Sequence, residues 1–144
     1  MIGIKVTVQL VDFNSLLERL DNGNDWECHL LGWGAGPADP AFGMNVLRSS
    51  GFGHQWFPKQ KTPATPWEAR IDELMNLQLH TFEQSERVKH YHEVQSILAE
   101  QQPMIFLVAM KAFSAVRTDL RNVRGSTLDV NRVLWNVEEL YFQK

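Results

Sequence analysis

A glycine-rich loop that carries one large aromatic side chain is the stretch best suited to contact a ligand. Residues 30–40 read Leu-Leu-Gly-Trp-Gly-Ala-Gly-Pro-Ala-Asp-Pro. Strands of α/β folds open into such loops at their carboxyl ends, which is where these folds bind ligands. Glycine lets a ligand approach the backbone, and aromatic side chains commonly line binding sites. The pattern predicts that Trp33 contacts a ligand; burial of its ring in the core is the alternative.

The spacing of glycines and histidines argues against a cofactor or a metal. The glycines of residues 32–36 follow G-x-G-x-G, and Pro37 stands where a dinucleotide-binding loop needs its third glycine. His90 and His92 are two residues apart, so on a helix they point to different sides, whereas the helical zinc motif needs histidines four apart. We therefore expect no cofactor and no bound metal.

Motifs for covalent or acid–base catalysis are also missing from the sequence. No serine stands in a G-x-S-x-G motif, and Cys28 has no reactive motif around it. Asp39 has no second carboxylate at an offset typical of an acid–base pair. We expect a binding protein with no catalytic residues. An enzyme stays open as an alternative, because catalytic groups can converge from distant parts of a chain.

The first part of the chain has the pattern of a strand–helix–strand unit. Residues 4–11 alternate apolar and polar side chains, which predicts a half-buried strand. Residues 13–20 carry the apolar stripe of a short helix, with Asp12 as a plausible N-cap. Residues 26–33 read as a second strand that leads into the glycine loop. The short links predict that the two strands are parallel.

The second part has stronger helix signals. Thr65-Pro66-Trp67-Glu68 is a capping box with proline at the first helical position, so we expect a helix over residues 66–80. A second helix should end near residue 102, before Pro103. Residues 40–47 favour a short helix. Residues 105–108 favour a strand that is buried on both faces. Residues 134–142 favour a strand or a short helix. The expected buried positions of the two long helices are Ile71, Leu74, Met75 and Leu79, then Val88, Tyr91, Val94, Gln95 and Leu98.

Composition narrows the class of protein. The 144 residues suit one compact domain, and 44% hydrophobic residues suffice for a core. A net charge of −3 without any basic run argues against nucleic-acid binding. A single cysteine excludes an internal disulfide. No apolar stretch reaches membrane-spanning length, and the sequence shows no signal peptide.

Several short motifs, taken in order, resemble the C-terminal part of the family 5 extracellular solute-binding proteins. These are the peptide, dipeptide and nickel receptors of bacterial ABC importers. The matching motifs are Leu31-Gly32-Trp33-Gly34, Ala38-Asp39-Pro40, Ile71-Asp72-Glu73-Leu74, Glu86-Arg87, Gln95-Ser96-Ile97-Leu98 and Gln102-Pro103-Met104-Ile105. Each motif is moderately specific, and their common order and spacing are more so. The resemblance extends over nearly the whole chain.

The resemblance implies an α/β fold: part of one lobe of a type II periplasmic-binding-protein fold, with a mixed sheet flanked by helices. Residues 1–112 would form part of the C-terminal lobe. Residues 113–144 would return to the other, N-terminal lobe of a longer parent, which this chain lacks. Family members trap their ligand between the two lobes. A parent of this type is periplasmic or extracellular, where it is lipid-anchored, and this chain lacks its signal sequence.

The same resemblance assigns roles to loop residues. It implies that Trp33, Gly34, Ala35 and Gly36 line the ligand cavity. Gly36 occupies the position of the aspartate that binds a peptide's amino terminus in peptide receptors, so the amine anchor is missing here. Asp39 belongs to an Asp-Pro pair common in the family, and we include it in the ligand-binding set, although capping the turn after the loop is its simpler role.

The expected function is therefore that of a solute-binding component of an ABC importer. A peptide is the default solute that the resemblance implies, but Gly36 weakens this assignment, and a sugar, an opine or a metal chelate stays open. The partners of this component would be a peptide or small-molecule solute, the missing lobe and the membrane permease. An independent α/β interaction or oligomerisation domain is the alternative, because a piece of a lobe would carry exposed apolar surface and could self-associate.

Overall fold

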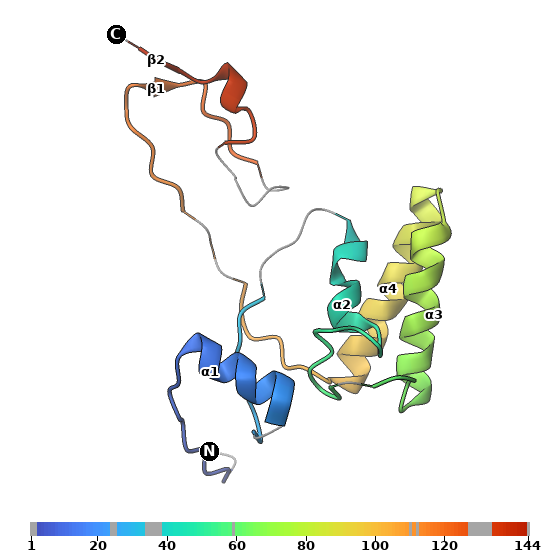
Figure 1. Cartoon of the computed structure of the whole chain (residues 1–144). Helices are drawn as coiled ribbons and strands as arrows, with labels where there is room; N and C mark the ends of the chain where they lie inside the picture. Colours follow the sequence, from blue (N-terminus) through green and yellow to red (C-terminus); the bar gives the residue numbers. More distant parts are fainter. Residues whose placement is uncertain are drawn as a thin grey trace. The chain divides into compact units, whose positions relative to one another are not determined.

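The computed structural model describes residues 3–23, 26–33, 39–58, 60–109, 111, 113–126 and 134–143. The chain divides into two compact units, Met1–Gly32 and Trp33–Lys144. Within the described residues, the secondary structure consists of four α-helices, one two-stranded sheet and short π- and 3-10-helical turns (Figure 1). None of these helices is long and apolar enough to cross a membrane.

The first unit holds one short helix. Helix α1 spans Phe13–Glu18 and continues into a π-helical turn, Arg19–Gly23. Its predicted N-cap is confirmed: a carboxylate oxygen of Asp12 accepts a hydrogen bond from the Ser15 amide at 3.1 Å. Leu20 is buried in this unit.

The two strands predicted on either side of α1 are not found. Residues 4–10 and 28–33 form no strand pairing within the described chain. The apolar side chains at alternate positions of the first segment are 71–93% exposed. An alternating pattern marks a chain that fits a sheet, but a strand forms only when a neighbour supplies hydrogen bonds. The described residues contain no such neighbour, so the predicted parallel pair is wrong here.

The second unit is built on a helical hairpin. Helix α3 spans Pro66–His80 and helix α4 spans Gln84–Gln101; the two lie side by side (Figure 1). The 3-10 turn Pro40–Gly43 and helix α2, Met44–Leu47, pack against α3. Both long helices and the short helical segment therefore occur where the sequence predicted them. The reason is that caps and proline mark helix ends locally.

The core of the second unit lies among α2, α3 and α4. Its buried members are Leu47, Ile71, Leu74, Met75, Val94 and Leu98. Tyr91 and both tryptophans at positions 56 and 67 pack against them. The prediction was wrong for Leu79, Val88 and Gln95, which are exposed. Outside this core, Arg70 of α3 donates two hydrogen bonds to Glu93 of α4, at 2.7 and 3.0 Å.

Residues 105–108 were predicted to be a strand buried on both faces, and the structure contradicts this. All four side chains are exposed, and the segment pairs with no described strand. The observed sheet is smaller: β1, Leu120–Arg121, pairs antiparallel with β2, Tyr141–Phe142. A 3-10 turn, Val137–Glu139, precedes β2. The predicted mixed sheet flanked by helices is therefore not present within the described chain, and the predicted boundary between residues 112 and 113 stays a prediction.

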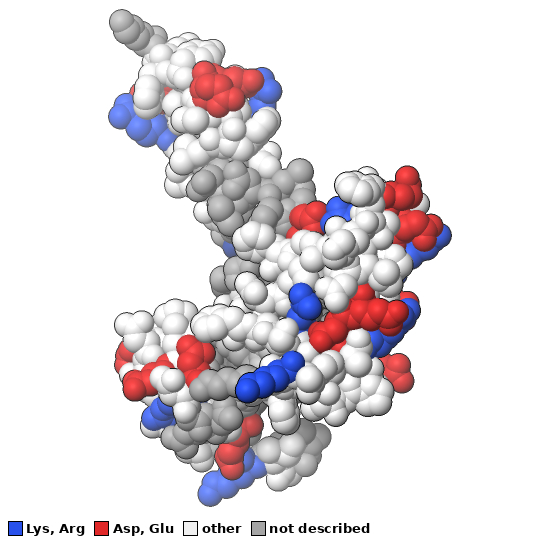
Figure 2. Space-filling model, turned by 45° about the vertical axis from the view of Figure 1, so that its right-hand side comes forward, with Lys and Arg blue, Asp and Glu red and all other residues white. Residues whose placement is uncertain are grey.

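Charged side chains of both signs are interspersed on the face drawn in Figure 2. Several form ion pairs along the helices, such as Lys89 with Glu86 at 2.6 Å and Arg70 with Glu73 at 2.7 Å. This mixture fits the small negative net charge of the sequence.

Candidate functional site

Trp33, the first residue of the second unit, keeps half of its surface in solvent. Its exposed fraction is 50%. The ring rests against Gly53: a β-carbon at that glycine would lie 3.2 Å from Cη2 of the tryptophan. A half-exposed indole with one edge on a glycine has a free surface for a ligand, so its geometry is compatible with the predicted contact. Gly34, Ala35 and Gly36, the other predicted contacts of this loop, lie outside the described residues.

Asp39 is held by three different elements. Its carboxylate caps the Pro40–Gly43 turn, because Oδ1 accepts a hydrogen bond from the Ala41 amide at 2.9 Å. Both of its oxygens accept hydrogen bonds from Nη2 of Arg87 on α4, each at 2.8 Å. The side-chain amide of Gln78 on α3 donates a further bond of 3.3 Å. The turn-capping role expected of Asp39 is therefore observed, and nothing described here tests its predicted ligand contact.

These bonds also set the charge state of Asp39. The hydrogen bond from Arg87, supported by the one from the Ala41 amide, lowers the pKa of the Asp39 carboxyl below its ordinary value. The side chain is therefore ionised at neutral pH, and both oxygens are occupied. The lowered pKa makes the Asp39 carboxylate a weak base.

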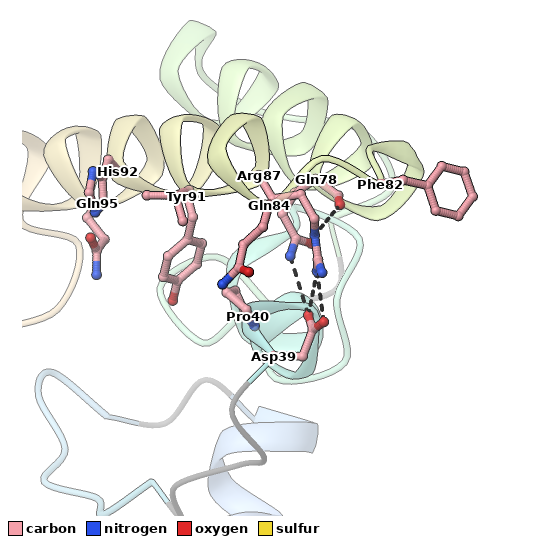
Figure 3. A pocket seen from close by; sticks show the side chains of 10 residues that line it. Asp39, Pro40, Gln78, Phe82, Gln84, Arg87, Tyr91, His92 and Gln95 are labelled. Atoms are coloured by element: carbon pink, nitrogen blue, oxygen red, sulfur yellow. Dashed lines mark hydrogen bonds and ion pairs between the residues drawn. The ribbon is translucent and has the colours of Figure 1, made fainter. Parts of the chain in front are cut away.

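A pocket of about 560 Å³ begins at Asp39 and follows one face of α4 (Figure 3). Helix α4 contributes side chains spaced three or four residues apart, the spacing of a single helical face. Val88 and Gln95, which were expected in the core, line this pocket instead. The described residues that line the pocket are Asp39, Pro40, Gln78, Phe82, Gln84, Arg87, Val88, Tyr91, His92 and Gln95.

The pocket combines polar and apolar side chains, and its charges are balanced. Asp39 is the only carboxylate among the described lining residues, and the ion pair with Arg87 compensates both charges. What remains is a set of side-chain amides, a tyrosine hydroxyl and a histidine ring beside apolar Phe82 and Val88. Such groups can donate hydrogen bonds to neutral polar molecules and accept bonds from them. In the part of the chain that the structure describes, no three His, Cys, Asp or Glu side chains gather closely enough to hold a metal ion.

The sequence analysis missed a buried polar cluster around Glu68. The predicted capping box is present: Thr65 and Glu68 bond each other's backbone amides, at 3.2 and 2.9 Å. The same carboxylate, only 2% exposed, also accepts hydrogen bonds from Gln60 at 2.8 Å and from the Trp56 indole at 3.1 Å. His54 lies 3.3 Å from it. The segment before the helix is irregular, so no periodic pattern could reveal these partners.

Comparison with known proteins adds a second line of observation. No protein-family model matches the chain, and no solved structure matches it. The chain is similar to two proteins named for peptide binding or transport. The oligopeptide-binding protein AppA of Bacillus subtilis is 24% identical over 148 residues, which cover 99% of this chain and 25% of that protein. The peptide transport periplasmic protein SapA of Haemophilus influenzae is 26% identical over 144 residues, or 96% of this chain and 24% of that protein.

The similarity is distant, and it runs along nearly the whole of this chain. The chain spans about a quarter of the length of these two relatives. The solute-binding resemblance stated from the motifs thus has independent support at the level of a distant relationship to peptide-binding proteins.

Proposed function

We propose that this chain is a segment of a solute receptor of the peptide type, part of an ABC importer of the family 5 class. It would contribute one wall of the ligand cleft, formed by Trp33, Gly34, Ala35, Gly36 and Asp39. The observation that carries this proposal is the similarity of almost the entire chain to one quarter of two proteins named for peptide binding or transport. The half-exposed Trp33 supports it, because an indole with a free face suits ligand contact.

The mechanism follows from a two-lobe arrangement. A receptor of this kind captures its solute when two lobes close around it by a hinge motion, and then delivers the solute to a membrane permease. This chain would form part of the C-terminal lobe, with a partial periplasmic-binding fold, and residues 113–144 would return to the N-terminal lobe. In such a protein the chain acts by binding alone, without a cofactor and without catalysis, in the periplasm or lipid-anchored outside the cell.

Exposed apolar segments support the view that further chain is needed. Residues 4–10, 105–108 and 113–116 present apolar side chains to solvent. Large exposed apolar surfaces commonly mark an interaction site. In the receptor these segments would be covered by the remainder of the protein.

The same exposed segments favour a second candidate function, an interaction or oligomerisation domain that covers them with another copy of itself. Sedimentation of the 144-residue chain separates the two proposals. A stable dimer in which Trp33 becomes protected from solvent quenchers would favour this second function. A monomer, or an association that leaves Trp33 accessible, contradicts it.

The test of the receptor proposal is calorimetric titration with short peptides of both the 144-residue chain and the receptor that contains it. We expect binding by the receptor and weak or no binding by the chain alone, since half of the cleft is then missing. Tight binding by the isolated chain would contradict the two-lobe account. At the gene, a reading frame limited to these 144 residues, without neighbouring permease and ATPase genes, would contradict the importer assignment.

The role of Trp33 needs its own variant and control. In the receptor, Trp33→Ala should weaken peptide binding at least about tenfold, the scale of a buried aromatic contact in an interface. Trp135→Ala is the matched control, because Trp135 is also about half exposed, at 46%, and lies in the C-terminal segment. Unchanged affinity in Trp33→Ala would exclude this residue from the binding site.

A further inference from the structure

Gly53 is a buried glycine in the loop that follows helix α2, and its backbone conformation does not call for glycine. Glycine is favoured where φ lies in the left-handed region. Among the described glycines only Gly3 has a positive φ. The reason for a glycine at position 53 therefore lies in the space around it.

The three nearest neighbours of a β-carbon at Gly53 would come from two different stretches of the second unit. The β-carbon would lie 3.2 Å from Cη2 of Trp33, 3.3 Å from the backbone oxygen of Asn45 and 3.5 Å from Cγ2 of Val46. The third distance is an ordinary van der Waals contact, whereas the first two are shorter than that. The missing β-carbon thus leaves a hollow in which the edge of the indole rests.

Hydrogen bonds fix the backbone on one side of this hollow. The Gly53 amide donates to the Asn45 carbonyl at 2.7 Å. Nδ1 of His54 lies 3.0 Å from the Val46 carbonyl, which can only accept, so this ring nitrogen carries a proton and donates. The His54 side chain is completely buried. We call the backbone of Asn45, Val46 and Gly53 the indole seat.

Trp33 is the neighbour of Gly53 that can give way. The Asn45 carbonyl belongs to helix α2 and is held by the Gly53 amide, whereas half of the Trp33 surface is in solvent. A β-carbon at Gly53 would therefore displace the indole by a few tenths of an ångström. A displacement of that size matters in a binding site, because productive contacts must be held within about 0.5 Å.

We propose that Gly53 is a positioning residue for Trp33: the absence of a β-carbon lets the edge of the indole rest on the indole seat, which fixes where the free face of the ring lies. A ring that is already held along one edge loses less conformational freedom when a ligand binds to its other surface. This role in ligand binding rests on the proposed receptor function, whereas the contact between Trp33 and the seat does not.

The test follows the position of the Trp33 ring in the 144-residue chain. Tryptophan fluorinated at Cζ3, the atom next to Cη2, is incorporated, and the Trp33 resonance is assigned with Trp33→Phe. Gly53→Ala adds the missing β-carbon. Gly43→Ala is the matched control, since a β-carbon there would make an ordinary van der Waals contact, at 3.5 Å, with the side chain of Leu47.

Trp56 reports on the loop that carries the seat. The centroid of its ring lies 3.9 Å from that of His54, the residue next to Gly53, and its indole N–H donates to Glu68 at 3.1 Å. A shift of the Trp56 resonance would mean that the loop itself has moved. A constant Trp56 resonance places the change at Trp33.

We expect Gly53→Ala to shift the Trp33 resonance and to leave Trp56 unchanged, and Gly43→Ala to leave both unchanged. In the receptor, Gly53→Ala should weaken peptide binding about threefold, less than Trp33→Ala, because the indole is displaced and not removed. Phenylalanine has no atom equivalent to Cη2, so in a Trp33→Phe background Gly53→Ala should cause no further loss of affinity.

The proposal is overturned if Gly53→Ala moves Trp33 no more than Gly43→Ala does, if Trp56 shifts as much as Trp33, or if peptide affinity falls equally in both backgrounds or not at all. Should Gly53→Ala lose its helical signal, the double variant with Trp33→Phe decides. Recovery of the signal supports a clash with the indole, and continued loss shows that the glycine serves the Asn45 carbonyl instead. A wild-type receptor that binds no peptide refutes the proposed function, while the Trp33 spectra still decide whether the seat exists.

Discussion

Replacement of Glu68 by glutamine should lower the free energy of unfolding more than replacement of any exposed charged side chain on the same helix. Glu68 is buried, and its Oε1 accepts hydrogen bonds from Trp56 and Gln60. Its Oε2 accepts from the backbone amide and the hydroxyl of Thr65, each at 2.9 Å. A glutamine has only one acceptor oxygen. N–H groups donate to both carboxylate oxygens of Glu68, so in the variant at least one of these N–H groups must face the NH₂ group. No orientation of the new amide satisfies every donor.

The magnitude follows from that count. The least costly orientation turns the NH₂ group toward Thr65, because the Ala64 amide on that side also bonds the side-chain oxygen of Gln60 at 2.8 Å. The partly buried backbone N–H of Thr65 is then left without its acceptor, which costs about 1–3 kcal/mol. The remaining bonds lose their charge assistance. We expect Glu68→Gln to lower the free energy of unfolding by about 2–3 kcal/mol.

Urea denaturation, followed by the far-ultraviolet helical signal near neutral pH, measures this loss. Glu73→Gln on the same helix is the control, because Glu73 is exposed and its ion-pair partner among the described residues is Arg70. It should change stability by less than about 0.5 kcal/mol. A loss in Glu68→Gln no larger than that of the control would refute the argument that the buried carboxylate organises this cluster.

The pH dependence provides a second check on Glu68. Burial by itself raises the pKa of its carboxyl, but the hydrogen bonds from Gln60, Thr65, His54 and Trp56 outweigh burial and leave it below the ordinary value of 4.5. A lowered pKa in the folded state means that the stabilisation is complete above the ordinary value and disappears as pH falls through the folded one. The stability difference between wild type and Glu68→Gln should therefore shrink below about pH 4.5. A difference that is independent of pH would contradict the charged state.

Three further predictions address other parts of the second unit. Leu74→Ala, at a fully buried position, should lower the free energy of unfolding by about 2–5 kcal/mol in the same urea assay, and a loss below about 1 kcal/mol would show that this core is loosely packed. Gly51→Ala should destabilise the unit because its β-carbon would lie 2.3 Å from a backbone oxygen, whereas Gly125→Ala meets nothing within 4 Å and should be neutral; equal melting temperatures of the two variants would contradict this. Asp39, whose pKa is lowered by Arg87, should titrate closer to its ordinary value in Arg87→Gln when its carboxyl carbon is followed by NMR, and an unchanged titration would show that the ion pair does not form in solution.

Local signals explain which parts of this fold could be predicted. The capping box at Thr65 and Glu68, with Pro66 at the first helical position, predicted the start of α3. Pro103 predicted that α4 ends shortly before that residue. Helix hydrogen bonds join residues four apart, so their start and stop signals lie within the same short stretch.

The strand predictions for residues 4–11, 26–33 and 105–108 failed for the opposite reason, whereas residues 134–142, predicted as a strand or short helix, contain a 3-10 turn and β2. Residues 4–11 and 105–108 have side chains suited to a sheet. A strand, however, needs hydrogen bonds from a neighbouring strand, and in general that neighbour is distant in sequence. Alternation describes what a segment would bury and says nothing about whether a neighbour is present. The exposed apolar side chains of both segments are the structural sign that no described strand supplies it.

The sequence alone predicted the helices of the second unit, most of the apolar positions between them and the resemblance that led to the receptor proposal. Only the tertiary structure showed that Asp39 is bound by Arg87 and Gln78, and that Glu68 is the acceptor for Trp56. The residues of a helix cap lie within three positions of one another, so a short stretch of sequence is enough to recognise it. A carboxylate clamped from 39 and 48 residues away depends on how the helices pack, because only packing brings those donors within hydrogen-bonding distance.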